Sequence, residues 1–358
     1  MNVVFFLGPA FERWSPLTLE HGGAGGSESM AWALASRLAQ RGHHVRVFAE
    51  SAGLTGIFGG VAWHDWSSYP GTSCDVLIAS RRPEALDPER RIKAKHTLFW
   101  AHDAHYDDTL TPERAARYQH FLVLSEWHAG LWHARYPATK DRTVIVRNGI
   151  DRSLFAGGAK RDPHRLIYSS SPDRGLDIAL SVMPAVRARV VDASLHVFYG
   201  FETLSRRAER SEDAGLARYV ESLQRRLKSY ERFGVVFHGR KGPTELAVEF
   251  LKSGTWGYPT AFFETSCITA MQAQAAGCRI VTSPRGALTE TVGTRGTMIA
   301  EPLESPAYAA AYGDAVVAAL TQRNEDDRET LAAYAREHFD LEKLADHWDD
   351  MLRTLERP

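Results

Sequence analysis

One carboxylate followed by small hydroxylic residues stands where a helix is predicted to begin. Glu264 ends an apolar, aromatic run, and Thr265, Ser266, Cys267, Ile268 and Thr269 follow it. Small apolar residues at helical spacing continue to Gly277, and residues 278–282 have the composition of a buried strand. The free N–H groups of such a helix start bind anions, and phosphate is the anion we expect here. An ordinary turn between strand and helix is the alternative interpretation.

A second anion-binding pattern precedes another predicted helix. Residues 169–175 read SSSPDRG, in which Ser170 and its neighbours supply hydroxyl and backbone donors. Arg174 adds a planar fork of N–H donors that matches a phosphate group. The alternative is a serine or aspartate that caps the helix, beside a surface arginine.

Gly25 and Gly26 end a glycine-rich segment that leads directly into a strong helical pattern closed by Gly42. Glycines at the start of a helix allow a ligand to approach the backbone closely. The spacing differs from the GxGxxG fingerprint of dinucleotide-binding proteins. We therefore predict a ligand-binding loop, with a flexible linker as the alternative.

A polar cluster, His102, Asp103, His105 and Asp107, follows the predicted strand 96–100. Ligands of open α/β sheets bind beyond the carboxyl ends of the strands, where this cluster falls. The side chains could bind a metal ion, or His102 could donate to a substrate hydroxyl or phosphate. A solvated loop is the third interpretation, since the chain contains 15 histidines.

The composition is that of a globular protein with room for two domains. The chain has 358 residues, of which 44% are hydrophobic and 24% charged. A net charge of −1 gives no indication of nucleic-acid binding. Three scattered cysteines argue for a reducing compartment and against disulfides or structural zinc. The apolar N-terminal run is too short to span a bilayer, so we expect a cytoplasmic protein.

Apolar runs at regular spacing predict two sheets of the same kind. Predicted strands alternate with helical segments, which indicates parallel, doubly wound sheets. The flexible composition of residues 157–163 indicates a linker between them. We predict a first domain at 1–158, a second at 159–338 and a final helix at 339–358. The predicted strands are residues 3–7, 44–49, 75–79, 96–100, 121–124 and 143–146, and then 165–168, 194–199, 235–239 and 278–282.

The order of these motifs resembles the retaining glycosyltransferases of family 4. The motifs are GGSE at 25–28, NGID at 148–151, DRGLD at 173–177, FHG at 237–239 and FFET at 262–265, followed by AAG at 275–277. The resemblance covers nearly the whole chain and implies the GT-B architecture, in which two Rossmann-like doubly wound domains face a cleft. The final helix resembles the one that crosses back onto the first domain in that family.

The resemblance also implies roles in sugar transfer. Glu264 matches the family's first acidic residue, which faces the donor sugar. His102 resembles the first-domain histidine near the reaction centre, and Arg174 falls where a cation pairs with the diphosphate. These three residues are the catalytic residues that the resemblance predicts.

The other residues implied by the resemblance hold the nucleotide and the phosphates. Gln272 stands where the family usually has a second glutamate for the ribose hydroxyls. Glu290 matches a recurrent glutamate without an assigned role. The predicted donor-binding residues are Gly25, Gly26, Ser170, Arg174, Gly239, Arg240, Lys241, Thr265, Ser266, Cys267, Ile268, Thr269 and Gln272.

The implied function is transfer of a sugar from a UDP- or GDP-linked donor to an unidentified hydroxyl acceptor. No cofactor is implied, and no metal is expected where cationic side chains and N–H groups offset the charge of the leaving diphosphate. One alternative is a GT-B nucleotide-sugar epimerase, which needs no acceptor. The others are a metal-dependent hydrolase built on the cluster around His102 and a binding protein without turnover.

Acceptor contacts are predicted from loops of the first domain, at residues 11–21 and 53–72. Trp14, Trp63 and Trp66 could stack on sugar faces, although buried packing is the commoner fate of tryptophan. A basic segment could contact anionic lipid, with a solvated surface helix as the alternative. Its residues are Arg81, Arg82, Arg90, Arg91, Lys93 and Lys95.

Overall fold

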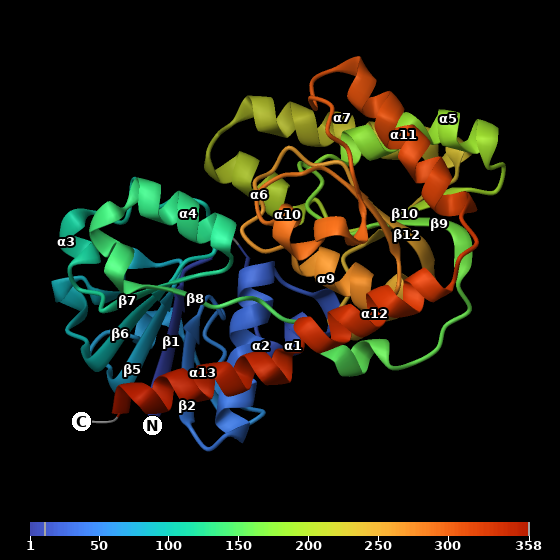
Figure 1. Cartoon of the computed structure of the whole chain (residues 1–358). Coiled ribbons are helices and arrows are strands. Elements are labelled where there is room, and N and C mark those ends of the chain that lie inside the picture. Colours follow the sequence, from blue (N-terminus) through green and yellow to red (C-terminus); the bar gives the residue numbers. More distant parts are fainter. Residues whose placement is uncertain (11, 357–358) are drawn as a thin grey trace. The chain divides into compact units, whose positions relative to one another are not determined.

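The computed structural model describes residues 1–10 and 12–356, so Phe11 of the predicted loop 11–21 lies outside the described residues. The chain divides into two compact units, each with its own sheet (Figure 1). The first unit contains Met1–Gly149 and the chain from Phe339 onward, and the second contains Ile150–His338.

The first unit ends before the predicted boundary at residue 158. The 3-10 helix Arg152–Phe155 packs against α8 (Pro243–Lys252) of the second unit, and Phe155 is buried. Burial of this aromatic ring assigns residues 150–155, which precede the predicted linker 157–163, to the second unit.

The sheet of the first unit is parallel except at one edge. Its strands are β1 (Asn2–Gly8), β2 (His44–Ala49), β3 (Gly56–Phe58), β4 (Val61–Asp65), β5 (Ser73–Ser80), β6 (Lys93–Trp100), β7 (His120–Val123) and β8 (Thr143–Ile145). They lie in the order β3-β4-β2-β1-β5-β6-β7-β8, and β3 alone runs antiparallel to its neighbour. The chain builds outward from β1 in both directions, so the strand order reverses between β1 and β5.

Helices cover both faces of this sheet. They are α1 (Pro16–Gly22), α2 (Gly26–Gln40), α3 (Pro112–Ala115), α4 (Glu126–Arg135) and α13 (Leu341–Glu356). α2 packs on β1, β2 and β4, whereas α4 packs on β7 and β8. Val4 and Phe6 of β1 share a buried cluster with Trp132 of α4, and the alternate residues Val3 and Phe5 are also buried. Burial on both faces explains the continuous apolar runs of the strands.

The second unit has a fully parallel sheet. Its strands are β9 (Asp162–Tyr168), β10 (Ser194–Phe198), β11 (Val235–Gly239), β12 (Ser253–Tyr258), β13 (Arg279–Thr282) and β14 (Thr297–Met298). They lie in the order β11-β10-β9-β12-β13-β14, so this sheet reverses between β9 and β12.

Helices also flank the second sheet. They are α5 (Leu176–Arg189), α6 (Glu202–Arg210), α7 (Ala214–Tyr230), α8, α9 (Ile268–Ala275), α10 (Leu288–Thr291), α11 (Pro306–Thr321) and α12 (Asp326–His338). α5 and α11 pack together on one face, and α9 packs with α8 and α12 on the other (Figure 1). α6 and α7 are separate helices, because the Asp213 side chain caps the start of α7.

Three segments of the first unit differ from the sequence predictions. The loop predicted at 11–21 contains α1, because Ser15 and Thr18 form a capping box at its start. The loop predicted at 53–72 contains β3 and β4, which extend the sheet edge. The basic segment forms 3-10 turns and the start of β6 instead of a surface helix.

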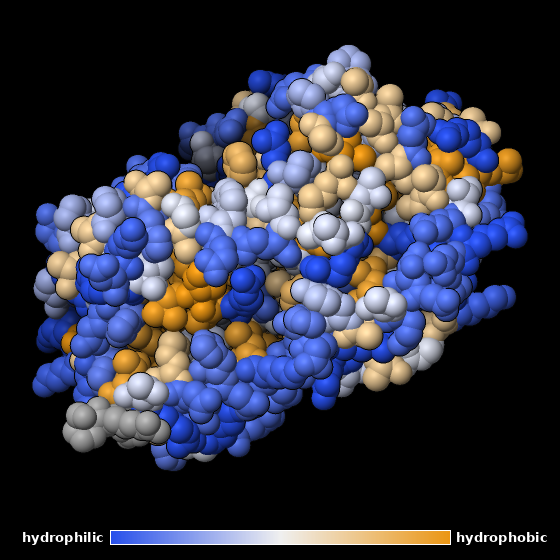
Figure 2. Space-filling model, in the orientation of Figure 1, coloured by the Kyte–Doolittle hydropathy of each residue, from blue (hydrophilic) through white to orange (hydrophobic). Residues whose placement is uncertain are grey.

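The visible surface is mostly hydrophilic, with apolar residues in separate areas (Figure 2). Scattered apolar residues are normal on a globular surface. Among the described residues, no helix combines the length and the apolar composition needed to cross a membrane.

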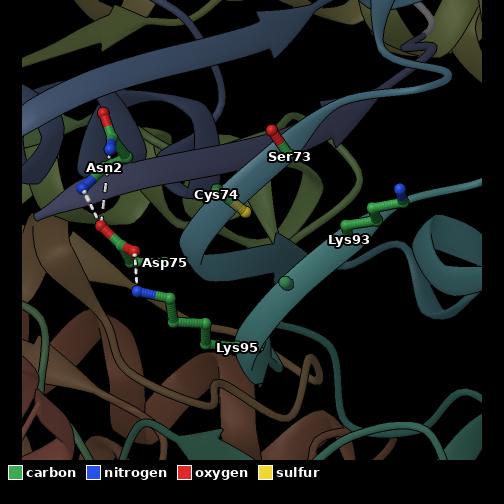
Figure 3. Close-up of a pocket in the computed structure, with 7 residues that line it drawn as sticks. Asn2, Ser73, Cys74, Asp75, Lys93 and Lys95 are labelled. Carbon is green, nitrogen blue, oxygen red and sulfur yellow. Dashed lines mark hydrogen bonds and ion pairs between the residues drawn. The ribbon is translucent and has the colours of Figure 1, made fainter.

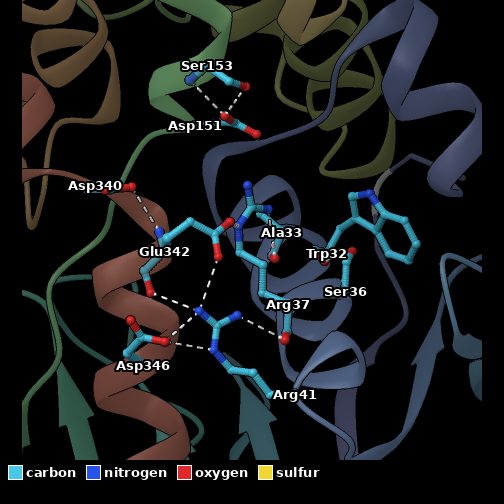
Figure 4. Close-up of polar contacts among 10 residues, drawn as sticks. All are labelled: Trp32, Ala33, Ser36, Arg37, Arg41, Asp151, Ser153, Asp340, Glu342 and Asp346. Carbon is cyan, nitrogen blue, oxygen red and sulfur yellow. Dashed lines mark hydrogen bonds and ion pairs between the residues drawn. The ribbon is translucent and has the colours of Figure 1, made fainter.

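The last helix is held on the first unit by an apolar stripe and a charged cluster. Leu341, Ala345, Trp348 and Leu352 recur at helical spacing and are buried. Figure 4 shows Arg37 of α2 and Arg41, the residue that caps its end, directed at α13. Arg41 donates to Asp346 at 2.6 Å and to Glu342 at 3.1 Å, and Arg37 donates to Glu342 at 2.6 Å. The acidic partners are exposed, so we attribute most of the docking energy to the apolar stripe.

Trp348→Ala should therefore lower the free energy of unfolding by about 3–5 kcal/mol, because it leaves a cavity between α13 and the sheet. Arg41→Ala should cost only about 1 kcal/mol, since its partners are exposed to solvent. Denaturant unfolding at low and high salt measures the loss of unfolding free energy in both variants. Only the loss in Arg41→Ala should become smaller at high salt. Equal losses for the two variants would contradict this division of the energy.

Candidate functional site

Three predicted residues of the second unit converge where its strand order reverses. Ser170 and Arg174 follow β9, and Glu264 follows β12. β9 and β12 are neighbours, and β9 also pairs with β10 on its other side. The crevice beyond the carboxyl ends of strands at such a reversal is the usual ligand site of open α/β sheets. The topology thus selects the same loops as the residue patterns.

Two glycines bring these loops into contact. Gly175, the N-cap of α5, has a φ of 101°, and a Cβ there would lie 2.7 Å from the carbonyl carbon of Pro259. Gly286 has a φ of 60°, and a Cβ there would lie 2.8 Å from the backbone nitrogen of Glu264. Both positions require a residue without a side chain, because positive φ and the close backbone leave no room for one.

A hydrogen-bonded network fixes the Glu264 carboxylate, which is buried. Tyr258 donates its hydroxyl to Glu264 Oε1 at 2.6 Å, and Arg174 Nη1 donates to the same oxygen at 3.3 Å. Ser170 donates to the Tyr258 hydroxyl at 3.3 Å. The fold thus brings three of the predicted site residues into one network: Ser170, Arg174 and Glu264. Tyr258, whose role the sequence did not indicate, links them.

The charges of this network are held in one protonation state. Burial works against the charge of Arg174, but Glu264, Tyr258, Asp173 and Tyr199 together raise the pKa of Arg174 above its usual value. Burial and the same carboxylate raise the pKa of Tyr258 well above its usual value. Arg174 therefore stays a cation and Tyr258 a hydrogen-bond donor at neutral pH.

α9 begins directly after this network. Its N-cap is Cys267, whose side chain makes no capping hydrogen bond to the helix. Burial raises the pKa of the Cys267 thiol, so the thiol is not a nucleophile at neutral pH. The predicted residues Thr265, Ser266, Ile268, Thr269 and Gln272 belong to the loop before α9 or to its first turns.

The predicted residues at β11 lie farther along the sheet. β10 separates β11 from β9, which is about 10 Å across two strand spacings. Arg240 donates to the Thr203 hydroxyl at 3.1 Å and lies over the Tyr199 ring, while Lys241 is paired with Glu245. Gly239 ends β11 with a positive φ.

In the first unit, the sequence missed a residue at the reversal point. Arg81 follows β5, with a φ of 63° that is strained for a residue other than glycine. Its guanidinium donates to both Asp103 oxygens, at 2.8 and 3.1 Å, and to the Ser27 hydroxyl at 3.1 Å. Arg81 thereby joins the predicted glycine loop, where Gly25 caps α2 and Gly26 begins it, to the loop that carries His102.

His102 lies at the carboxyl end of β6, on a loop fixed by Tyr106. The Tyr106 hydroxyl accepts from the N–H groups of His102 and Asp103, at 2.9 and 3.0 Å. The imidazole packs against Trp100 with ring centres 4.4 Å apart, and Trp100 contacts Trp348 of α13. Burial and the Arg81 charge lower the pKa of His102 to about 3, so it is neutral at physiological pH.

The metal-site interpretation finds no support. Asp103 is occupied by Arg81, and Asp107 pairs with Arg135. The part of the chain that the structure describes contains no group of three or more His, Cys, Asp or Glu side chains placed to hold a metal ion.

Two of the three tryptophans considered for acceptor contacts follow the alternative, buried packing. Trp14 and Trp63 are buried against each other, and Trp66 donates its ring N–H to Glu50 at 3.1 Å. In the basic segment, Arg81 turns to Asp103, Arg82 donates to the Leu7 and Pro9 carbonyls, and Arg90 lies over Phe6. The other three members, Arg91, Lys93 and Lys95, are exposed.

A hollow at the opposite end of the first sheet contains none of the predicted catalytic or donor-binding residues, although Lys93 and Lys95 of the basic segment line it (Figure 3). It is lined by the first residues of β1, β5 and β6, where Asp75 accepts from the Asn2 N–H at 2.7 Å and pairs with Lys95 at 2.8 Å. An eight-residue strand separates this hollow from Arg81 by about 25 Å.

Comparison with known proteins identifies the fold. No family model and no curated protein matches the chain by sequence. Sucrose-phosphate synthase from Thermosynechococcus elongatus is similar in structure, with 16% identity, a TM-score of 0.69 and 99% of both chains covered. Anabaena HepE in complex with UDP and glucose has 14% identity and a TM-score of 0.68, with 99% of this chain and 100% of HepE covered. WaaG, a glycosyltransferase involved in lipopolysaccharide biosynthesis, has 18% identity and a TM-score of 0.65, with 98% and 99% covered. These structures confirm the predicted fold class, two Rossmann-like domains as in GT-B glycosyltransferases.

Gly175→Ala should destabilise the second unit by more than about 2 kcal/mol, because the new methyl group would overlap Pro259. Thermal unfolding measures the effect. Gly157→Ala is the matched control, since a Cβ at Gly157 would meet no atom within 4 Å. An unchanged Gly175→Ala protein would show that the two loops can separate at little cost.

The buried His128 should make the protein less stable in mild acid. Burial lowers the pKa of His128 to about 4, whereas an unfolded chain has the ordinary value near 6.5. The unfolded chain therefore binds more protons between these pH values, and stability falls as pH falls through this window, by about 3 kcal/mol at pH 4. His128→Asn should flatten this dependence in denaturant unfolding, and the exposed His347→Asn should not. The same slope in all three proteins would exclude His128 as the cause.

Proposed function

We propose that this protein is a glycosyltransferase that moves a sugar from a nucleoside-diphosphate sugar to a hydroxyl acceptor with retention of configuration. The observation that carries the proposal is the Arg174–Glu264 pair at the reversal point of the second sheet, beside the start of α9. The solved HepE complex with UDP and glucose supports UDP as the nucleotide of the donor.

Arg174 is the proposed cation for the diphosphate. As the bond between sugar and phosphate breaks, negative charge grows on the leaving diphosphate. A guanidinium and the N–H groups at the start of α9 stabilise this charge without rearrangement, because the fold already holds them. The residues around that helix start, Ser266 to Thr269, are the proposed contacts with phosphate and sugar oxygens. In this proposal, no metal ion is needed to stabilise the negative charge on the leaving diphosphate.

Glu264 is the proposed acceptor for the hydroxyl groups of the donor sugar. One oxygen accepts from Tyr258 and Arg174, which leaves the other for a sugar hydroxyl. The carboxylate orients the sugar in this proposal and is not a covalent nucleophile. A neutral His102, with Gly25 and Gly26, is the proposed contribution of the first unit to donor binding.

Gln272 favours a second candidate function, a nucleotide-sugar binding protein without turnover. The family that the sequence resembles usually has a glutamate there for the ribose, and glutamine keeps hydrogen bonding but not the charge. Release of free UDP from UDP-glucose, with and without a panel of hydroxyl acceptors, separates the candidates. Release that depends on an acceptor identifies a transferase, and binding without release identifies a binding protein.

Calorimetric titration with UDP, in buffer with and without EDTA, tests the donor site. Arg174→Ala should weaken UDP binding roughly 10- to 100-fold, as expected for charge-assisted hydrogen bonds to a diphosphate. Glu264→Ala should weaken UDP-glucose binding more than UDP binding, because the carboxylate contacts the sugar in the proposal.

Arg189→Ala is the matched control for Arg174→Ala, because Arg189 forms an exposed ion pair with Asp314 elsewhere in the second unit. It should bind UDP as the wild type does. A wild type that binds neither UDP nor GDP would exclude an intact donor site.

A further inference from the structure

An exposed phenylalanine covers the proposed diphosphate cation. The guanidinium carbon of Arg174 lies 3.7 Å from the ring centre of Phe262. Phe262 is 44% exposed, so hydrophobic burial does not explain its position. The adjacent Phe263 is 50% exposed and has Arg285 over its ring at 5.6 Å.

The backbone places Phe262 at this point. Its N–H donates to the hydroxyl of Thr260 at 3.0 Å, and Thr260 is fully buried. The preceding Pro259 is pressed against Gly175, the residue after Arg174. The ring and the guanidinium therefore come from two loops that the same backbone contact holds together.

The ring restrains Arg174 without using its donors. A guanidinium has five N–H groups in one plane, and an aromatic ring attracts it through its face. Among the described residues, Arg174 donates a hydrogen bond to Glu264 alone, at a long 3.3 Å. The covered face limits rotation of the plane, while N–H groups along its edge remain for a ligand.

We propose that Phe262 is a positioning residue that holds the Arg174 guanidinium in the orientation that binds a diphosphate. This inference rests on the proposed function, because it assigns to Arg174 the same ligand. Phe262 itself makes no contact with the reacting atoms. Its effect passes through Arg174, and so it should depend on the phosphate groups of the ligand.

Calorimetric titration of UDP and UMP into the whole chain tests this role. Phe262→Ala should weaken UDP binding roughly three- to tenfold, because a free guanidinium must be ordered when it binds. UMP binding should change less than about twofold, since it lacks the second phosphate. Phe262→Trp should restore wild-type affinity, because indole is the better partner of a cation, and Phe262→Leu should not.

Two comparisons separate positioning from a general effect. Phe263→Ala is the matched control and should bind UDP as the wild type does. In the Arg174→Ala background, Phe262→Ala should cause no further loss, because the residue through which it acts is gone. Thermal unfolding without nucleotide checks that the exposed substitutions leave the fold intact.

Equal losses for UDP and UMP, the same loss in Phe263→Ala, or a further loss in the Arg174→Ala background would each overturn the inference. So would a Phe262→Ala protein with unchanged affinity, and in that case the proposed function stands. A wild type that binds no UDP would overturn the proposed function and this role together.

Discussion

The site in the second unit depends on one close approach of two backbone segments. Gly175 lies against Pro259 so closely that a single methyl group would not fit between them. This contact joins the loop after β9 to the loop after β12, which are neighbours only because the sheet reverses there. Arg174 and Glu264 meet as a consequence, although 90 residues of chain separate them. Gly286 supports the arrangement from the other side, at the backbone of Glu264.

In the first unit, two loops are also held together at the point where the strand order reverses. There a charged side chain, not a backbone contact, joins the loops. Arg81 connects the start of α2 to the loop after β6 through Ser27 and Asp103. Its backbone has a strained, positive φ in this position. Strain of this kind persists only where surrounding contacts hold it, and it is common at functional positions.

The electrostatics of the two sites are complementary in kind. In the second unit, burial and mutual proximity keep Arg174 charged beside a carboxylate, with a helix start close by. In the first unit, burial keeps His102 and His128 neutral. A fixed cation suits a ligand that carries charge throughout, and a neutral imidazole suits one with hydroxyl groups. Both properties fit a nucleoside-diphosphate sugar, as the proposed function requires.

Local sequence determined the elements and the loops that matter, but not the direction of their side chains. The apolar runs placed most of the strands, and β9, α5 and β13 lie within a few residues of the predicted ranges, because period and turn residues are local signals. β3, β4, β12 and β14 are not among the predicted strands. The motifs placed Ser170 and Arg174 after one predicted strand and Glu264 after an apolar run, and the fold made those two segments neighbours. Tertiary structure alone decided that Tyr258 orients Glu264, that Arg81 turns to Asp103, and that Trp14 and Trp63 pack together. It also placed Phe155 in the second unit. Those outcomes depend on which strands become neighbours, and pairings between residues distant in the chain leave no trace in a local pattern.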